Sequence, residues 1–362
     1  VMTNEAAHAE QADVIAEVKT LFANGFDKLS DEKLIKLLGH EDQRVRIEAQ
    51  WEVSTRPIDF ALWSVLSDSE SLELARLHAL WALGMKARRD SDAYQYIGAG
   101  TDDASAHIRS QVAQLLGDLN SGPADLALID MLEDPSIAVQ HHAAIALGKA
   151  GDIKAIPFLF DLLERNDNND VVIRHAASYG LSLIGDSETI HKEMKSRGAA
   201  ERLGGVLALR HLKSPLLVNY IEDEDLQIAA EAVRAIYDQK IDEHLPAIAK
   251  LANTLPPERM IEPIMRRVVE ANVRLADADS ANRLAKIAAN ADAPEQWRAL
   301  ALQELTNWSA KRDRDDVWGW WLPRQPQTMA HASAAMKTHL PAVKATATGG
   351  TLTQARVFEP YF

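Results

Sequence analysis

Residues 41–53, EDQRVRIEAQWEV, decide the fold, because weaker copies of this stretch recur along the chain to about Trp308. The basic residue Arg46 serves as an anchor for aligning the copies. The steps between anchors are roughly 25 to 39 residues and average about 32, which is the span of a two-helix solenoid repeat. The equivalent anchors are Arg76, Arg109, Gln140, Arg174, Arg202, Gln227, Arg266 and Arg298.

Apolar residues lie at fixed positions around each anchor. In the first copy, Val45 precedes the anchor, and Ala49 and Val53 follow four and eight residues after Val45. A row with this spacing is one face of a helix, and its small middle residue lets a neighbouring helix approach closely. The equivalent rows are Ala75, Ala79 and Leu83; Ile108, Val112 and Leu116; Val139, Ala143 and Leu147; Ile173, Ala177 and Leu181; Met265, Val269 and Val273; and Trp297, Ala301 and Leu305.

A second apolar segment lies upstream of each row, as at residues 34–38, and the two segments form a helical hairpin. A single hairpin cannot bury both of its faces, but stacked hairpins share a continuous core. The sequence therefore predicts an all-α fold, an α-α superhelix of roughly eight or nine helical hairpins with an irregular C-terminal tail.

Polar and glycine residues predict where the helices begin and end. Asp42 and Asp170 lie at helix starts, where a carboxylate accepts hydrogen bonds from free backbone amides. Ser30 is predicted to cap the first outer helix in the same way. Several inner helices run into a glycine, which adopts a left-handed C-terminal conformation without steric penalty. These glycines are Gly84, Gly117, Gly148 and Gly185.

Three regions follow from this pattern. Residues 1–29 contain a capping helix, at about residues 4–22, that covers the open face of the first repeat. Residues 30–308 form the repeats, with a bend or hinge expected at residues 197–205 and 255–257. Residues 309–362 form a Trp-rich linker, a short helix at residues 328–340 stopped by Pro341, and a strand or extended arm after Gly350.

The net charge of −14 and the absence of cysteine exclude several classes of function. Phosphate contacts need clustered Lys and Arg, so no nucleic acid partner is expected. No apolar run approaches the roughly 20 residues that span a bilayer, so no membrane insertion is expected. Without cysteine there are no thiolate nucleophiles, disulfides or Cys-ligated metals. The chain opens with Val1 and Met2 and has no signal peptide, which indicates a piece of a longer protein.

Four repeat segments and one Trp-containing segment carry a family resemblance. The repeat segments are LLGHEDQRVRIEAQ (residues 37–50), LARLHALWALG (residues 74–84), the Arg109 helix that ends in LLGD, and NNDVVIRHAASYGL (residues 168–181). The Trp-containing segment has the pattern D-x-V-x-G-x-W-x-P, with Asp315, Val317, Gly319, Trp321 and Pro323. Over roughly residues 18–323 the chain resembles the HEAT-repeat region of PVC-type haem-binding dehydrogenase-like proteins.

That resemblance implies a HEAT-like solenoid between a sugar-dehydrogenase-like β-propeller and a c-type cytochrome domain, in a periplasmic or exported protein. Covalent haem attachment needs C-x-x-C-H, and this chain has no cysteine. No cofactor is therefore expected in this segment, and haem c is expected only in a cytochrome domain outside it. The partners implied are neighbouring domains of the parent protein or another protein.

The anchors also predict an inter-repeat ladder of charge-assisted hydrogen bonds between adjacent repeats. The alternative is a basic stripe that binds a substrate. The members of the ladder are Asp42, Arg46, Arg76, Arg109, Asp170 and Arg174.

Histidines recur beside the anchors. His78 and His142 lie two residues after an anchor, and His141 and His175 lie one residue after. Equivalent positions of adjacent repeats are roughly 10 Å apart, too far to share one zinc with bonds of about 2.0 Å, so no metal site is predicted. These imidazoles either bond neighbouring helices or line the inner surface, which makes His78, His142 and His175 candidate interface residues. A contact with a metal or a haem edge is the alternative.

A tryptophan cluster outside the repeats is the strongest functional lead. Trp308, Trp318, Trp320 and Trp321 have no obvious core to fill, and large aromatic side chains in such places often anchor interfaces. Either this segment folds back to cap the end of the solenoid, or it docks a neighbouring domain.

No Gly-rich phosphate loop, H-E-x-x-H or G-x-S-x-G motif occurs, and the segment is predicted not to be an enzyme. The leading hypothesis is a non-catalytic scaffold, a segment of a larger haem-binding dehydrogenase-like protein that positions redox domains. The alternative is a free-standing interaction module that binds a basic or extended peptide on its concave face. A third hypothesis, an enzyme like the HEAT-like lyases or glycosylases, is disfavoured by the acidic balance and the missing thiol.

Overall fold

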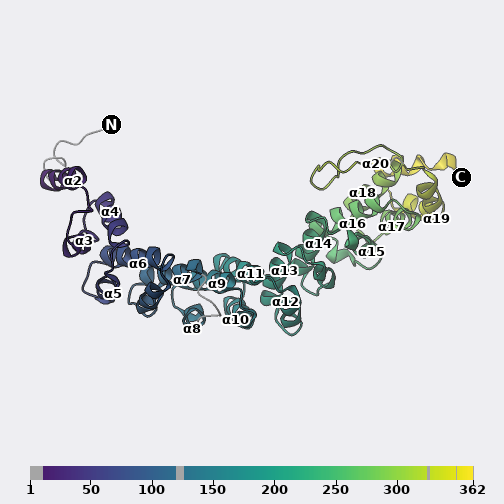
Figure 1. The fold of residues 1–362 in the computed structure, drawn as a ribbon. Coiled ribbons are helices and arrows are strands. Elements are labelled where there is room, and N and C mark those ends of the chain that lie inside the picture. The colour runs from purple at the N-terminus through teal and green to yellow at the C-terminus, as the bar shows by residue number, and fades with distance from the viewer. Residues whose placement is uncertain (1–10, 120–125, 324–326, 348, 362) are drawn as a thin grey trace. The chain divides into compact units, whose positions relative to one another are not determined.

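A computed structural model describes residues 11–119, 126–323, 327–347 and 349–361 (Figure 1). It confirms the predicted all-α fold. The described residues contain no strand, only one isolated antiparallel bridge between Arg314 and Trp321. The chain divides into two compact units, residues 1–189 (unit 1) and residues 190–362 (unit 2), and each unit is a stack of short helices.

In unit 1 the outer helices lie along one side and the inner helices along the other (Figure 1). The N-terminal helix is α2 (Ala12–Asn24), and the first part of the predicted capping helix, residues 4–10, lies outside the described residues. The outer helices are α3 (Asp31–Leu37), α5 (Asp59–Ser67), α8 (Leu126–Asp130) and α10 (Ile156–Asn166), and the inner helices are α4 (Gln43–Val53), α6 (Glu73–Ala87), α7 (Ala106–Leu119), α9 (Ile137–Ala150) and α11 (Val171–Ile184). The 3-10 segments are η1 (Ser91–Gly100), η2 (Met131–Glu133) and η3 (Ile153–Ala155), and α12 (Ser187–Met194) spans the boundary between the units.

The predicted apolar rows form the core of both units. Val45, Ala49 and Val53 are fully buried, and the equivalent residues of the other six rows are buried as well, except for the half-buried Ala75. The i, i+4, i+8 spacing therefore identified the buried face of each inner helix. Two predicted caps are also confirmed, since the amide of Lys33 donates to Ser30 and the amide of Arg44 donates to Asp42.

Three of the four glycines predicted to end helices have a different role. Gly84, Gly117 and Gly148 lie inside α6, α7 and α9, and only Gly185 has the left-handed conformation of a helix end. A Cβ at Gly148 would lie 2.6 Å from the Cα of Gly180 in α11. These glycines are therefore points of close helix contact, and the prediction was wrong because sequence alone does not give the distance between helices.

Unit 2 continues with shorter and less regular hairpins. Its helices are α13 (Ala199–His211), α14 (Leu226–Asp238), α15 (Leu245–Lys250), α16 (Glu262–Leu275), α17 (Ala278–Ala289), α18 (Glu295–Thr306), α19 (Ala330–Thr346) and α20 (Gly349–Arg356). Its 3-10 segments are η4 (Pro215–Tyr220), η5 (Asp242–His244), η6 (Leu251–Asn253), η7 (Pro257–Arg259) and η8 (Glu359–Tyr361). Gly204 and Gly205, at the predicted bend, lie within α13, and the hinge stays a prediction.

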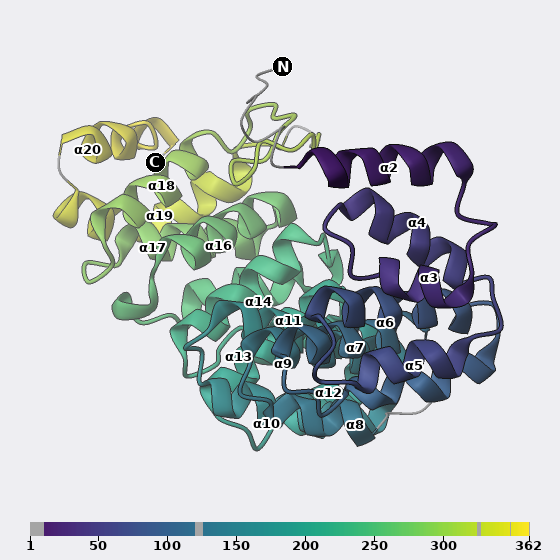
Figure 2. The same cartoon turned by 90° about the vertical axis from the view of Figure 1, so that its left-hand side faces the viewer.

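The end of the chain is more helical than its sequence indicates. Helix α19 does not stop at Pro341 but runs through it to Thr346, and residues 349–356 form α20 instead of a strand or extended arm. Leu340 and Val343 are buried, and α19 packs beside α17 (Figure 2). Burial of this face offsets the roughly 3 kcal/mol that an internal proline costs a helix. The prediction failed because it weighed local propensity without this packing.

Candidate functional site

Two anchor arginines of unit 1, Arg76 and Arg109, form ion pairs that bridge successive repeats. Arg109 in α7 forms an ion pair with Asp134, with a distance of 2.6 Å between Arg109 Nε and Asp134 Oδ2. Its Nη1 also donates to the backbone carbonyl of Asp103 at 2.6 Å. Arg76 in α6 pairs in the same way with the side chain of Asp103. Each guanidinium thus ties its own repeat to the loop before the next inner helix.

The predicted acids of the ladder have another role. Asp42 and Asp170 cap their own helices: Asp42 bonds the amide and side chain of Arg44, and Asp170 accepts from the amides of Val172 and Ile173. The acids that pair with arginine lie six residues before the next anchor, as Asp103 and Asp134 do. The sequence shows this spacing, but it does not distinguish it from the acids at the helix starts, since an acid at either position could pair with an arginine of the neighbouring repeat.

Two predicted members of the ladder differ from Arg76 and Arg109. Arg46 donates to the carbonyls of His40 at 2.6 Å and Glu41 at 2.9 Å, and its Nε donates to His78 Nε2 at 3.2 Å. The Arg174 side chain has no hydrogen bond or ion pair with the residues that the structure describes. The ion pairs of Arg76 and Arg109 and the bond from Arg46 to His78 connect neighbouring repeats, which favours the structural ladder over a substrate-binding stripe.

His78 is a buried link between α4 and α6. Its Nε2 accepts from Arg46, so Nδ1 carries the proton and donates to Gln50 Oε1 at 2.7 Å. Burial, followed by the charge of Arg46, lowers the pKa of His78 to about 4. The imidazole is therefore neutral and enclosed, so His78 does not form part of an exposed interface.

The other histidines lie nearer the surface of unit 1. His142 is half-buried and edge-on to His141, with ring centroids 5.1 Å apart, and burial is the main cause that lowers its pKa. His175 is exposed and stacks on Tyr179. Among the described residues, no group of three or more His, Asp or Glu side chains is arranged to hold a metal ion.

The tryptophan segment forms a hairpin that folds onto unit 2. The buried carboxylate of Asp315 organises this Trp hairpin, residues 313–322. It accepts hydrogen bonds from the Tyr237 hydroxyl at 3.0 Å and from the amides of Trp318 and Trp320 at 3.2 and 2.7 Å. Trp318 Nε1 donates to Asp238 of α14 at 2.8 Å. The turn of the hairpin is thus held from inside by Asp315 and is attached to α14 through Tyr237 and Asp238.

The four tryptophans divide into two groups. Trp308 is only 7% exposed and belongs to the interior, and Trp320 is half-buried with Lys240 5.1 Å above its ring centroid. In contrast, Trp318 is 55% exposed and Trp321 is 63% exposed. The segment therefore folds back on its own unit and presents two indoles to solvent, and docking of a neighbouring domain stays a prediction.

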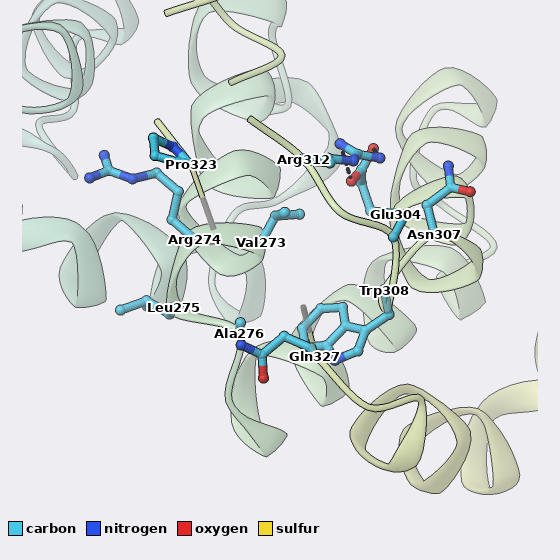
Figure 3. Close-up of a pocket in the computed structure, with 11 residues that line it drawn as sticks. Val273, Arg274, Leu275, Ala276, Glu304, Asn307, Trp308, Arg312, Pro323 and Gln327 are labelled. Carbon is cyan, nitrogen blue, oxygen red and sulfur yellow. Dashed lines mark hydrogen bonds and ion pairs between the residues drawn. The ribbon is translucent and has the colours of Figure 1, made fainter. Parts of the chain in front are cut away.

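A cavity of about 270 Å³ lies against Trp308, between α16 and α18 (Figure 3). Glu304 and Arg312 form an ion pair of 2.8 Å on one wall, and Arg274 lies on another. Trp308 Nε1 is buried and has no hydrogen-bond acceptor among the residues that the structure describes. An unpaired buried donor costs about 1–3 kcal/mol of stability, so the indole of Trp308 lowers the free energy of unfolding relative to a residue without this N–H.

The class of protein follows from the hairpins and from one family match. Residues 126–192 match the family model of HEAT repeats, which includes α8 to α11. The fold is therefore a HEAT-like α-solenoid, which confirms the solenoid predicted from the repeats.

Two curated relatives match a short part of the chain. Deoxyhypusine hydroxylase of Candida albicans is 35% identical over 63 residues, which is 17% of this chain and 20% of the relative. The human deoxyhypusine hydroxylase is 36% identical over 70 residues, 19% of this chain and 23% of the relative. The chain thus spans about a fifth of the length of the curated relatives it matches. A solved structure of Kap95p with RanGDP has a TM-score of 0.49 and 14% identity, covering 94% of this chain and 51% of that one.

These relatives overturn one prediction. Both are enzymes, so the prediction that the segment is not an enzyme is contradicted. It inferred an absence of catalysis from the absence of cysteine and short motifs. In a helical-repeat protein, reacting side chains can come from helices far apart in sequence, and no short motif records them.

The described helices also bear on membrane insertion. None of them combines the length and the apolar character that crossing a bilayer requires.

Proposed function

We propose that the chain is a protein-binding α-solenoid whose partner docks on the exposed indoles of the Trp hairpin. The observation that carries this proposal is the exposure of Trp318 and Trp321 on a hairpin fixed by the buried Asp315. Tryptophan is enriched among the residues that dominate binding energy. A fixed hairpin loses little conformational entropy on binding, which favours affinity.

Photo-cross-linking from position 311, an exposed lysine just before the Trp hairpin, identifies a partner in cell extract, and purified components then give its affinity. Trp321→Ala should weaken binding at least tenfold, because a central interface tryptophan contributes about 2 kcal/mol or more. The matched control is Trp51→Ala, since Trp51 in α4 is 53% exposed. Binding unaffected by Trp321→Ala would refute docking at the hairpin.

A narrower form of the proposal comes from the family resemblance. In it, the solenoid holds a dehydrogenase-like propeller and a c-type cytochrome domain in register, inside a periplasmic or exported protein. The relatives and structure named above are neither dehydrogenases nor cytochromes, so this form rests on the repeat and Trp motifs alone. Sequencing the gene on both sides of this segment tests it, and a downstream region without C-x-x-C-H would count against it.

The curated relatives supply a second candidate, a hydroxylase activity. It rests on their names and on the short match, which overlies part of the solenoid. The test is incubation of the full chain with a deoxyhypusine-containing peptide, dioxygen and a reductant that supplies two electrons per turnover, so that the second oxygen atom leaves as water. A mass gain of one oxygen atom would support this candidate, and an unchanged peptide alongside an active hydroxylase control would reject it.

A further inference from the structure

A cleft of about 410 Å³ lies beside the Trp hairpin in unit 2. Four arginines line it, Arg210 of α13, Arg234 of α14, and Arg266 and Arg267 of α16, together with two acids and two apolar residues, Asp238, Glu262, Val317 and Trp318. Four arginines around one cleft are unexpected in a chain of net charge −14. They come from three helices, so no short stretch of sequence indicates the cluster.

The acids nearby do not use all of the available donors. Arg267 is satisfied, because its Nε and Nη2 donate to the two carboxylate oxygens of Asp238 at 3.0 and 3.1 Å. Arg266 pairs with Glu262 at 3.6 Å and donates to the backbone carbonyl of Asp316 at 2.7 Å. Arg210 and Arg234, both partly exposed, share the single carboxylate of Glu231 at 3.1 and 2.8 Å. A guanidinium has five N–H donors, so most donors of this pair have no acceptor among the described residues.

Trp318 adds an apolar wall. Its indole is fixed, because Nε1 donates to Asp238 and the ring stacks on Trp320 with centroids 6.0 Å apart. More than half of its surface still faces solvent. The cleft therefore combines spare guanidinium donors with a rigid aromatic surface.

We propose that this cleft binds an acidic, extended peptide segment of the partner, with carboxylates on Arg210 and Arg234 and an apolar side chain against Trp318. Arginine binds carboxylates through paired, charge-assisted hydrogen bonds. The inference deepens the proposed docking function and specifies the chemistry of the docked segment. A nucleic acid fits less well, since its affinity needs many phosphate contacts and the chain is acidic overall.

The probe is a fluorescein-labelled peptide of alternating Glu and Leu, measured by fluorescence anisotropy with the full chain. The peptide should bind, and its affinity should fall as salt rises. Arg234→Glu should weaken binding at least tenfold, and Trp318→Ala about fivefold. Arg88→Glu, an exposed arginine of unit 1, is the matched control and should change the affinity less than twofold.

Three results with the peptide probes and RNA would overturn the inference. They are no binding of the acidic peptide, equal binding of a Lys and Leu peptide, or tighter binding of single-stranded RNA that Arg234→Glu abolishes. Far-ultraviolet circular dichroism checks that each variant is folded, and Arg234→Gln replaces Arg234→Glu if the latter is not. If Trp321→Ala weakens binding of the natural partner and Arg234→Glu does not, docking at the hairpin stands and the acidic-peptide inference fails.

Discussion

Substituting Gly148 by alanine should destabilise unit 1, although alanine is the better helix former. The new Cβ would lie 2.6 Å from the Cα, 2.7 Å from the carbonyl oxygen and 3.0 Å from the carbonyl carbon of Gly180. Carbon atoms in contact are about 3.5–4.0 Å apart, so α9 and α11 must separate by on the order of 1 Å. Backbone atoms cannot rotate away as a side chain can.

The two opposing effects can be weighed. Alanine gains about 1 kcal/mol over glycine within a helix, and overpacking a close contact costs about 1–3 kcal/mol. A clash with backbone belongs at the upper end, which leaves a net loss of about 2 kcal/mol. For a unit of this size, each kcal/mol shifts the melting temperature by about 2–4 °C, so the expected fall is about 4–8 °C.

Thermal unfolding followed by circular dichroism at 222 nm measures this change. The matched control is Gly98→Ala, because a Cβ at Gly98 meets no atom within 4 Å, and it should shift the melting temperature by less than about 2 °C. If Gly148→Ala melted at or above the wild-type temperature, the close approach of α9 and α11 would be refuted.

Three further predictions concern buried polar groups. Arg109→Met should cost about 3 kcal/mol in urea unfolding at pH 7, because it leaves Asp134 buried without its partner. Burial alone would raise the pKa of Asp134, but the bonds from Arg109 and a backbone amide outweigh it and lower that pKa. The loss caused by Arg109→Met should therefore shrink as the pH falls below about 4, and a constant difference would contradict the pairing. The pKa of His78 falls from 6.5 to about 4 on folding, so the unfolded state binds a proton more readily than the folded state. The free energy of unfolding should therefore decrease by up to about 3 kcal/mol as the pH is lowered from 6.5 to 4, and His78→Gln should flatten this dependence. Trp297→Phe should cost about 1–2 kcal/mol more than Trp308→Phe, because only Trp297 Nε1 has an acceptor, at 2.7 Å; equal losses in matched urea titrations would argue against an unpaired donor at Trp308.

The repeat was predictable because its cause is local and repeated. Burial of one helix face requires the spacing seen at Val45, Ala49 and Val53, and the same requirement recurs in every hairpin. Helix starts at Ser30 and Asp42 were predictable for a similar reason, since a cap bonds an amide only two or three residues away.

The missed features depend on distances between segments. The contact of Gly148 with Gly180 requires knowledge of how close two helices come, and the continuation of α19 past Pro341 depends on packing against α17. The arginine cleft draws Arg210 and Arg234 from different helices. Of the candidate site, composition indicated the tryptophans but not which indoles remain exposed.

The junction between α9 and α11 differs from those before it in one respect. Its anchor is the neutral Gln140, which donates to the backbone carbonyl of Asp134 and forms no ion pair, and at this same junction Gly148 of α9 meets Gly180 of α11. Salt weakens exposed charge pairs far more than buried ones, and the Arg76–Asp103 and Arg109–Asp134 pairs are largely buried. The earlier junctions are therefore held by protected charge pairs, whereas the junction of α9 and α11 depends on the steric fit of two glycines.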